Sequence, residues 1–330
     1  MTKHPLLGIC IPTYKRPDQL RRCVESIIRT AAPFGVPIYV ADDSADDTNV
    51  ATMAELQKQY PLVFHHRNPK NLGIDGNILN CVNLCECRHA WIIGEDDRMT
   101  PDAVATVLPV LERGERPFVY VNYSAVDEAL EVVLKERSLP LEADAERSAE
   151  DFFSSDSWSI GFIGSCVVQM DLWRRIEAAR YVGTYFAHVG VIMEYLRGRS
   201  VHLVAKPVVL NRCGTPQAFT WTQSTFDVLF GWDRMVGRLR GVYPDDVCDR
   251  AVACFRRAHG IGSIKFFCYL RADSVLDPEV HDRYVRDAPY PPLNRLAAWW
   301  IARTPPAAFR AARWALMGMR RGRNRRISGY

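Results

Sequence analysis

Short apolar runs alternate with segments of helical spacing along residues 1–125. The apolar runs are typical of buried strands and cover residues 6–12, 37–41, 62–66 and 91–94. Between them apolar residues recur at helical spacing, as at Leu20, Cys23, Val24, Ile27 and Ile28. Alternation of strands with helices predicts βαβ units, and therefore an α/β fold with a mostly parallel sheet and helices on both faces.

Each predicted strand leads into a polar segment. The four segments are Thr13-Tyr14-Lys15-Arg16, Asp42-Asp43-Ser44, the stretch from Asn68 through Asn71 and Gly73 to Asn77, and Glu95-Asp96-Asp97. In an open α/β sheet, ligands bind beyond the carboxyl ends of the strands. The four polar segments are therefore predicted to gather around one ligand site.

The three consecutive acids after the fourth strand carry the clearest chemical signal. Adjacent carboxylates repel one another, so a positive group is expected beside them. A hard divalent cation, Mg²⁺ or Mn²⁺, takes oxygen ligands and is commonly shared with a phosphate. The alternative is an acidic turn that caps the helix predicted after Thr100-Pro101-Asp102, since acids favour helix starts.

The order of these motifs resembles the family 2 inverting glycosyltransferases. The resemblance rests on Pro12-Thr13-Tyr14-Lys15-Arg16-Pro17, the Asp42-Asp43-Ser44 segment, Asn71 with Gly73 and Asn77, and Gly94-Glu95-Asp96-Asp97. It covers about residues 5–125 and fades beyond them. Gly94 to Asp97, with the later Tyr185-Phe186-Ala187-His188, is similar to the group that adds sugars to bacterial surface polysaccharides and O-antigens.

The resemblance implies a nucleotide-diphospho-sugar donor and assigns roles to individual residues. Thr13 and Tyr14 would line the nucleobase and ribose pocket, Asp43 with Asp42 would take the base edge, and Asp97 would hold the metal on the two phosphates. The other donor-site candidates are Pro12, Arg16, Asn71, Gly73, Asn77, Glu95 and Asp96. Glu95 stands where the family usually has Asp.

An inverting transfer also needs one base to take the proton of the acceptor hydroxyl. The family usually supplies an acid from the second half of the domain, and no such motif stands out here. The candidates are Asp156, His188 and Glu194. His188 titrates near neutrality and could be a base or a further metal ligand, although a lone histidine near a helix start is more often structural.

Further elements are expected in the second half of the chain. Strands are predicted over 117–126 and 201–210, and an acidic connection over 127–150. Helices are predicted over 167–179, around His188 and Glu194, over 225–239 and over 246–272. The ten cysteines lie mostly in apolar stretches and lack zinc spacing, which indicates buried reduced thiols.

The C-terminal segment is basic and rich in aromatic residues. After Asp287 there are nine arginines and no acid, so with a net charge of +4 for the whole chain the rest carries −5. Trp299, Trp300 and Trp314 accompany the arginines, and Pro305-Pro306 divides the segment into predicted helices over 293–303 and 306–320. This pattern is typical of a helix lying on an anionic membrane. Packing of the tryptophans on the domain is the competing interpretation, and nucleic-acid binding has no supporting motif.

Together these features predict three regions: a nucleotide-sugar-binding catalytic domain over 1–215, with a donor half to about 125 and an acceptor half over 126–215; a helical region over 216–292; and a membrane-associating tail over 293–330. The resemblance implies inverting transfer of a sugar from a nucleotide-diphospho-sugar to a hydroxyl of a lipid-linked saccharide. Since Met1 leads straight into the first strand, we expect no signal peptide and a place on the inner face of the cytoplasmic membrane.

Two other functions remain open from the sequence. A membrane-bound scaffold with a degenerate sugar-nucleotide fold is one, because the base is not evident. A sugar nucleotidyltransferase is the other. It would need a glycine-rich phosphate loop at residues 13–16, where the sequence is Thr-Tyr-Lys-Arg and contains no glycine.

Overall fold

One twisted ten-stranded sheet runs through the protein. A computed structural model describes residues 5–213 and 225–312. The strands are β1 (Leu7–Thr13), β2 (Ile38–Asp42), β3 (Val63–Arg67), β4 (His89–Ile92), β5 (Arg98–Met99), β6 (Phe118–Val126), β7 (Val133–Lys135), β8 (Ala145–Ser148), β9 (Cys166–Gln169) and β10 (Ser200–Arg212). The main order is β3-β2-β1-β4-β9-β6-β10-β5, with β7 on β6 and β8 on β10.

The sheet is mixed: four pairings between the described strands are parallel, as predicted, and five are antiparallel. Strands β3, β2, β1 and β4 form a parallel block, and β6 pairs in parallel with β10. Between the two blocks β9 runs antiparallel to both β4 and β6. The register pairs Thr13 with Asp42 and Asp42 with Arg67, so the carboxyl ends of the first three strands lie level.

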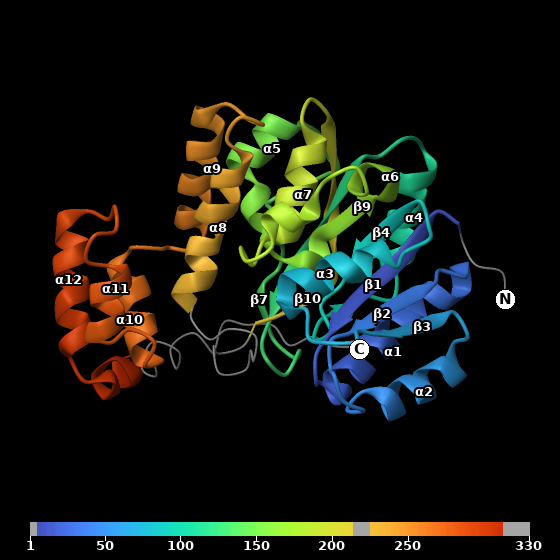
Figure 1. The fold of residues 1–330 in the computed structure, drawn as a ribbon, viewed down its shortest axis with the longest axis horizontal. Coiled ribbons are helices and arrows are strands. Elements are labelled where there is room, and N and C mark those ends of the chain that lie inside the picture. Colours follow the sequence, from blue (N-terminus) through green and yellow to red (C-terminus); the bar gives the residue numbers. More distant parts are fainter. Residues whose placement is uncertain (1–4, 214–224, 313–330) are drawn as a thin grey trace.

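Helices cover both faces of the sheet (Figure 1). On one face lie α1 (Pro17–Ala31), α2 (Val50–Gln59) and α4 (Ala103–Glu112). On the other lie α3 (Gly73–Asn83), α5 (Ala149–Ser155), α6 (Met170–Trp173), α7 (Ala187–Leu196), α8 (Thr225–Leu239) and α9 (Asp245–Ala258). Alternate strand residues serve the two cores: Ile9 and Ile11 face the first layer and Cys10 the second. The α/β class with helices on both faces is thereby confirmed.

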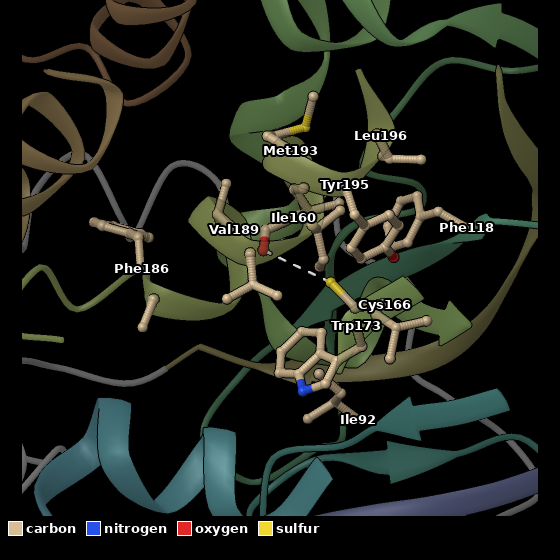
Figure 2. Close-up of a cluster of buried hydrophobic side chains, with 14 of the residues drawn as sticks. Ile92, Phe118, Ile160, Cys166, Trp173, Phe186, Val189, Met193, Tyr195 and Leu196 are labelled. Carbon is tan, nitrogen blue, oxygen red and sulfur yellow. Dashed lines mark hydrogen bonds between the residues drawn. The ribbon is translucent and has the colours of Figure 1, made fainter. Parts of the chain in front are cut away.

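The second core contains a dense aromatic and aliphatic cluster, shown in Figure 2. Cys166, on β9, lies among Ile160, Trp173 and Tyr195, and its thiol lies 3.8 Å from the carbonyl oxygen of Ile160. All four side chains are buried to 4% exposure or less. This packing holds the antiparallel strand β9 in the middle of the sheet.

The predicted helix over 167–179 is wrong. Its first residues form β9, followed by the single turn α6 and a 3₁₀ turn over Ala178–Tyr181. Val167 and Val168 fill the gap between β4 and β6, and β-branched residues fit a sheet flanked on both sides. The fourth strand also ends earlier than predicted, at Ile92, so the acids lie in the turn between β4 and β5.

Three C-terminal helices form a separate cluster. They are α10 (Ile264–Ala272), α11 (Pro278–Tyr284) and α12 (Pro292–Arg303), and they share a hydrophobic core with Phe226 at the start of α8. This agrees with the predicted helical extension. The predicted helix over 306–320 lies mostly outside the described residues, and its part over 306–312 is helical. Among the described residues no helix is both long and apolar enough to cross a lipid bilayer.

Candidate functional site

The acid run lies at the carboxyl edge of the parallel strands. Glu95 accepts hydrogen bonds from the hydroxyl of Thr13 and from the backbone N–H of Tyr14, the latter at 2.9 Å. These contacts join the loop after β1 to the turn after β4. Burial raises the pKa of Glu95 to about 7, against the opposing effect of the Thr13 and Tyr14 hydrogen bonds. These contacts bring the polar segment after β1 and the acid run together, as the sequence predicted.

Asp96 lies between two guanidinium groups. Its Oδ2 is 3.4 Å from Arg16 Nη1 and 3.3 Å from Arg212 Nη1. Arg16 also approaches Glu95 at 3.6 Å, and its side chain is only 9% exposed. The positive charge expected beside the acids is therefore supplied in part by two largely buried arginines, one just before α1 and one at the end of β10.

Asp97 is the most deeply placed of the three acids, with 4% of its surface exposed. Its Oδ1 accepts the backbone N–H of Arg212 at 3.0 Å. Burial and the neighbouring charge of Asp96 raise the pKa of Asp97 well above its usual range. No cationic side chain lies within ion-pair distance of Asp97 among residues 5–213 and 225–312, so its negative charge is poorly compensated.

A cavity of about 80 Å³ lies beside Asp97. Its lining includes Asp96, Asp97, Gln19, Arg22, Arg98, Glu128 and Arg212. Within the described chain no three His, Cys, Asp or Glu side chains converge on a common metal position. Mg²⁺ commonly binds proteins through one or two carboxylates and takes its other ligands from phosphates and water. An under-compensated carboxylate at a small polar cavity fits a cation of that kind.

Asp42, Asp43 and Asn77 make hydrogen bonds to the loops and strand ends around them. Asp42 is fully buried and accepts from Ser44 N–H at 2.9 Å, from the Asn49 amide at 3.0 Å and from His65 at 3.2 Å. Burial by itself would raise the pKa of Asp42, but these hydrogen bonds together lower it. The Asn77 amide donates to the carbonyl oxygens of Thr13 and Ala41, both at 3.2 Å, and so ties β1 to β2.

Asp43 binds the start of α3. Its carboxylate accepts the backbone N–H groups of Leu72 at 2.8 Å and Gly73 at 3.1 Å, and the Asn68 amide at 2.9 Å. Gly73 has a φ of +70°, which favours glycine, and Asn71 accepts its N–H at 2.7 Å. The predicted donor residues after β2 and β3 thus come together, through contacts that shape the loop.

Tyr14 and Pro12 complete the edge of the site. Tyr14 is 37% exposed and the adjacent Lys15 has a φ of +54°, held by a 2.8 Å hydrogen bond from its N–H to the Ser44 hydroxyl. Pro12 is partly buried on β1. An exposed ring beside the acid run offers a surface on which a flat base could stack.

The three candidate bases have different surroundings. Glu194 is held by Arg180 at 3.0 Å and by the Tyr181 hydroxyl at 2.7 Å. Asp156 is ion-paired with Arg147 at 3.0 Å, on strand β8, which pairs with the end of β10 away from Arg212. No described contact joins either carboxylate to the acid run.

His188 lies in the first turn of α7 and is 1% exposed. Its Nε2 is 2.9 Å from the carbonyl oxygen of Ile160, to which it donates, whereas Nδ1 has no hydrogen-bond partner among the described residues. Burial lowers the pKa of His188 below its ordinary value. A neutral imidazole with an unused acceptor nitrogen can take a proton.

Arg212 was missed by sequence reasoning. It ends β10, donates its backbone N–H to Asp97, and spans from Asp96 to Glu128, whose carboxylate lies 3.1 Å from Nη2. The available signal was its place two residues after the predicted strand over 201–210, because the ends of parallel strands share one edge. A lone arginine followed by Cys213 matched no motif.

Comparisons with known proteins agree with this geometry. The family model described as "Glycosyl transferase family 2" matches residues 8–156. The chain is 27% identical to abequosyltransferase RfbV of Salmonella typhimurium over 63% of its own length and 66% of the relative. It is 26% identical to a Campylobacter jejuni GalNAc(5)-diNAcBac-PP-undecaprenol beta-1,3-glucosyltransferase over 47% of its length and 51% of that relative.

Solved structures share the fold at low sequence identity. Staphylococcus aureus TarS 1-349 with UDP-GlcNAc superposes with a TM-score of 0.58 and 12% identity, covering 93% of this chain and 92% of that one. A mannosyltransferase from Pyrobaculum calidifontis with GDP-Man and Mn²⁺ superposes with a TM-score of 0.50 and 13% identity. The match covers 96% of this chain and 81% of that one. Residues 8–156 are thus similar to the glycosyl transferase family 2, and the chain spans about two thirds or less of the length of these curated relatives.

Proposed function

We propose that the protein transfers a sugar from a nucleotide-diphospho-sugar to a hydroxyl group of a saccharide, by a single displacement that inverts the anomeric carbon. The observation that carries the proposal is the acid run itself. Glu95, Asp96 and Asp97 are fixed at the carboxyl ends of the parallel strands, beside a small cavity and between Arg16 and Arg212. This is where an open α/β sheet binds its ligand.

The donor would lie along the loops after β1, β2 and β3. Tyr14 offers its exposed ring to the base, and Glu95 orients Tyr14 and Thr13 through two hydrogen bonds. Asp43 and Asn77 contribute by holding the loop with Asn71 and Gly73 to the ends of β1 and β2, and Asp42 holds the loop after β2 through Ser44 and Asn49. Pro12, near the end of β1, and Arg16, just before α1, lie at the same edge of the sheet.

A divalent metal, Mg²⁺ or Mn²⁺, would be held by Asp97, with Asp96 next to it. When bound, the metal offsets the negative charge that builds up on the departing diphosphate. Arg16 and Arg212 are placed to act on the same charge, because both guanidinium groups already lie within 3.4 Å of Asp96. The Mn²⁺ in the P. calidifontis enzyme supports the choice of cation.

His188 is the candidate base that the surroundings favour over Asp156 and Glu194. The acceptor hydroxyl would give its proton to Nδ1 while its oxygen forms the new bond to the anomeric carbon and the bond to the diphosphate breaks. Nδ1 is free to accept and the lowered pKa keeps the ring neutral, whereas both carboxylates are engaged with arginines. With 1% exposure, His188 reaches an acceptor only after the segments over it open.

The acceptor is proposed to be a lipid-linked saccharide, met at the inner face of the cytoplasmic membrane. The name of the C. jejuni relative contains a saccharide on PP-undecaprenol, which supports this class. Leu293, Leu296 and Trp300 of α12 are 77%, 57% and 62% exposed, with Arg295 and Arg303 on the same helix. Apolar side chains between arginines suit an anionic lipid surface.

The test is thermal stabilisation of the purified protein by UDP, GDP, CDP and dTDP, each with and without Mn²⁺. A ligand that binds only the folded state raises the melting temperature. We expect one nucleotide to give a Mn²⁺-dependent shift, and Asp97→Asn to lose the Mn²⁺ dependence while keeping its fold. A wild-type protein that responds to none of the four nucleotides would overturn the proposal.

A further inference from the structure

Asp75, on the first turn of α3, is a buried carboxylate that the donor site does not use. It is 5% exposed, and both of its oxygens accept backbone N–H groups from a segment more than a hundred residues away. Oδ2 accepts from Gly183 at 2.8 Å, Thr184 at 3.0 Å and Tyr185 at 2.9 Å, and Oδ1 from Ala187 at 3.2 Å. Four N–H groups on one carboxylate make this the main polar link between α3 and α7.

The segment that binds Asp75 has an unusual backbone. Gly183 has a φ of +86° and Tyr185 a φ of +65°, a left-handed conformation that is strained for a non-glycine residue. Successive N–H groups that converge in this way form a concave anion-binding site, and here the anion is a side chain of the same protein. The charge of Asp75 is therefore what holds Tyr185 in its strained conformation.

Two neighbours show that the segment is fitted closely. A side-chain carbon on Gly231 of α8 would overlap the carbonyl oxygen of Thr184, so α8 presses on the segment from outside. His188 follows directly in the first turn of α7, close enough to Asp75 for its charge to act on the ring. The direction in which α7 begins, and with it the position of His188, depends on these contacts.

At its other end the same turn of α3 belongs to the donor site. Asp43 accepts the N–H groups of Leu72 and Gly73, and Asn77 donates to carbonyl oxygens of β1 and β2. Asp75 lies between these anchors. Residues 72–77 thus form one rigid piece that contacts the nucleotide loops on one side and the start of α7 on the other. Both helices cover the same face of the sheet (Figure 1).

We propose that Asp75 is a positioning residue for sugar transfer: it fixes residues 183–187, and through them the start of α7, relative to the donor loops. This rests on the proposed function. Because reacting groups misplaced by about 1 Å can lower a rate about 100-fold, loss of this link should impair transfer far more than donor binding.

Asp75→Asn is the test variant, since it keeps the size of the side chain and removes the charge that the N–H groups need. Asp277→Asn is the matched control. Asp277 also accepts a backbone N–H, that of Val280 at 2.8 Å, but does so at the start of α11 in the separate C-terminal cluster. Backbone hydrogen–deuterium exchange over 183–187 and the melting-temperature shift with UDP, GDP, CDP and dTDP plus Mn²⁺ are measured on each full-length protein.

We expect Asp75→Asn to speed exchange over 183–187 about tenfold or more while the nucleotide shift stays within about 1 °C of wild type, and Asp277→Asn to change neither. Transfer is then measured with the nucleotide-sugar that carries the base found to stabilise the protein. We expect kcat to fall and KM for this donor to change less than about threefold. Unchanged exchange, or a loss of nucleotide binding equal to the loss of transfer, would overturn the proposal. If wild type binds no nucleotide, the proposed function fails, while the exchange result still decides whether Asp75 fixes the segment.

Discussion

Arg212 donates its backbone N–H to Oδ1 of Asp97 at 3.0 Å, so the last residue of β10 holds the acid run that follows β4. The Arg212 guanidinium also lies 3.3 Å from Asp96. The backbone contact survives any substitution except proline, whereas the guanidinium contact does not. The two contributions of this residue can therefore be separated by mutation.

Arg212→Ala should weaken the site and the fold together. It leaves Asp96 with Arg16 alone and removes the partner of Glu128, and the Arg212 side chain is only 12% exposed. We expect a loss of about 1–3 kcal/mol in the free energy of unfolding, and weaker nucleotide binding. Arg212→Lys should recover part of the binding, since lysine keeps the charge without the fork. Denaturant unfolding checks this, with Arg21→Ala at an exposed pair as the control; equal effects of the two alanines would contradict it.

Gly94→Ala should displace Asp97 without a large effect on the sheet. A side-chain carbon at Gly94 would overlap Oδ2 of Asp97, the oxygen not used by Arg212. We expect the Mn²⁺-dependent part of nucleotide binding to disappear and transfer to fall about 100-fold. Gly237→Ala in α8 is the control, because nothing lies within 4 Å of the added carbon, and it should stabilise by about 0.5–1 kcal/mol. Retained Mn²⁺ dependence in Gly94→Ala would argue against Asp97 as the metal ligand.

His188 should make the fold sensitive to mild acid. Burial lowers its pKa in the folded protein, whereas in the unfolded chain it takes a proton near pH 6.5. As the pH falls below that value, the unfolded state binds the proton first, so the free energy of unfolding falls with it. His188→Gln should flatten this dependence between about pH 7 and 5. The check is melting temperature against pH, with exposed His66→Gln as the control; parallel curves for wild type and His188→Gln would refute the expectation.

The exposed side of α12 should carry membrane binding. Leu296 and Trp300 are exposed, while Ala298, Ile301 and Ala302 of the same helix fill the C-terminal core. Replacing Leu296 and Trp300 by serine therefore leaves that core intact, unlike deletion of 293–330. We expect binding to phosphatidylglycerol vesicles to fall about tenfold or more, given about 1.5–3 kcal/mol per large apolar side chain. Vesicle sedimentation measures this, with phosphatidylcholine vesicles for comparison.

The control for membrane binding is Leu134→Ser, an equally exposed leucine on β7. If it reduces sedimentation as much as the α12 double variant, general surface hydrophobicity explains the binding. If neither does, α12 is not the lipid contact, and packing of the C-terminal segment on the protein becomes the better interpretation of its tryptophans.

Strands β1, β2 and β4 of the parallel block could be predicted because they are buried on both faces, whereas β3 lies at the sheet edge and is mostly exposed. Such strands appear as short apolar runs, and their polar ends identify the ligand edge without knowledge of the pairing. Cys166 to Gln169 could not be assigned in the same way. Four apolar and polar residues that run into Met170-Asp171-Leu172-Trp173 fit a helix equally well, and only the space between β4 and β6 decides for a strand.

The sequence predicted that the polar segments meet at one edge of the sheet, and hydrogen bonds join them there, but it did not predict which side chains bond to the loops themselves. Asp42, Asp43 and Asn77 were expected to face the nucleotide, and the structure shows each of them bonded to the loops themselves. Sequence order cannot distinguish a side chain that binds a ligand from one that shapes the loop around it. Asp75 illustrates the same limit, because its partners lie at 183–187 and only the folded chain brings them together.

The C-terminal helices have a hydrophobic core separate from the two cores that line the sheet. A change in α10, α11 or α12 alters contacts within that cluster and leaves the packing beneath the acid run untouched. Over evolutionary time such a region can be reshaped for a different surface or a different neighbour at little cost to the chemistry. The surface of the C-terminal helices and the site around the acid run can thus diverge independently.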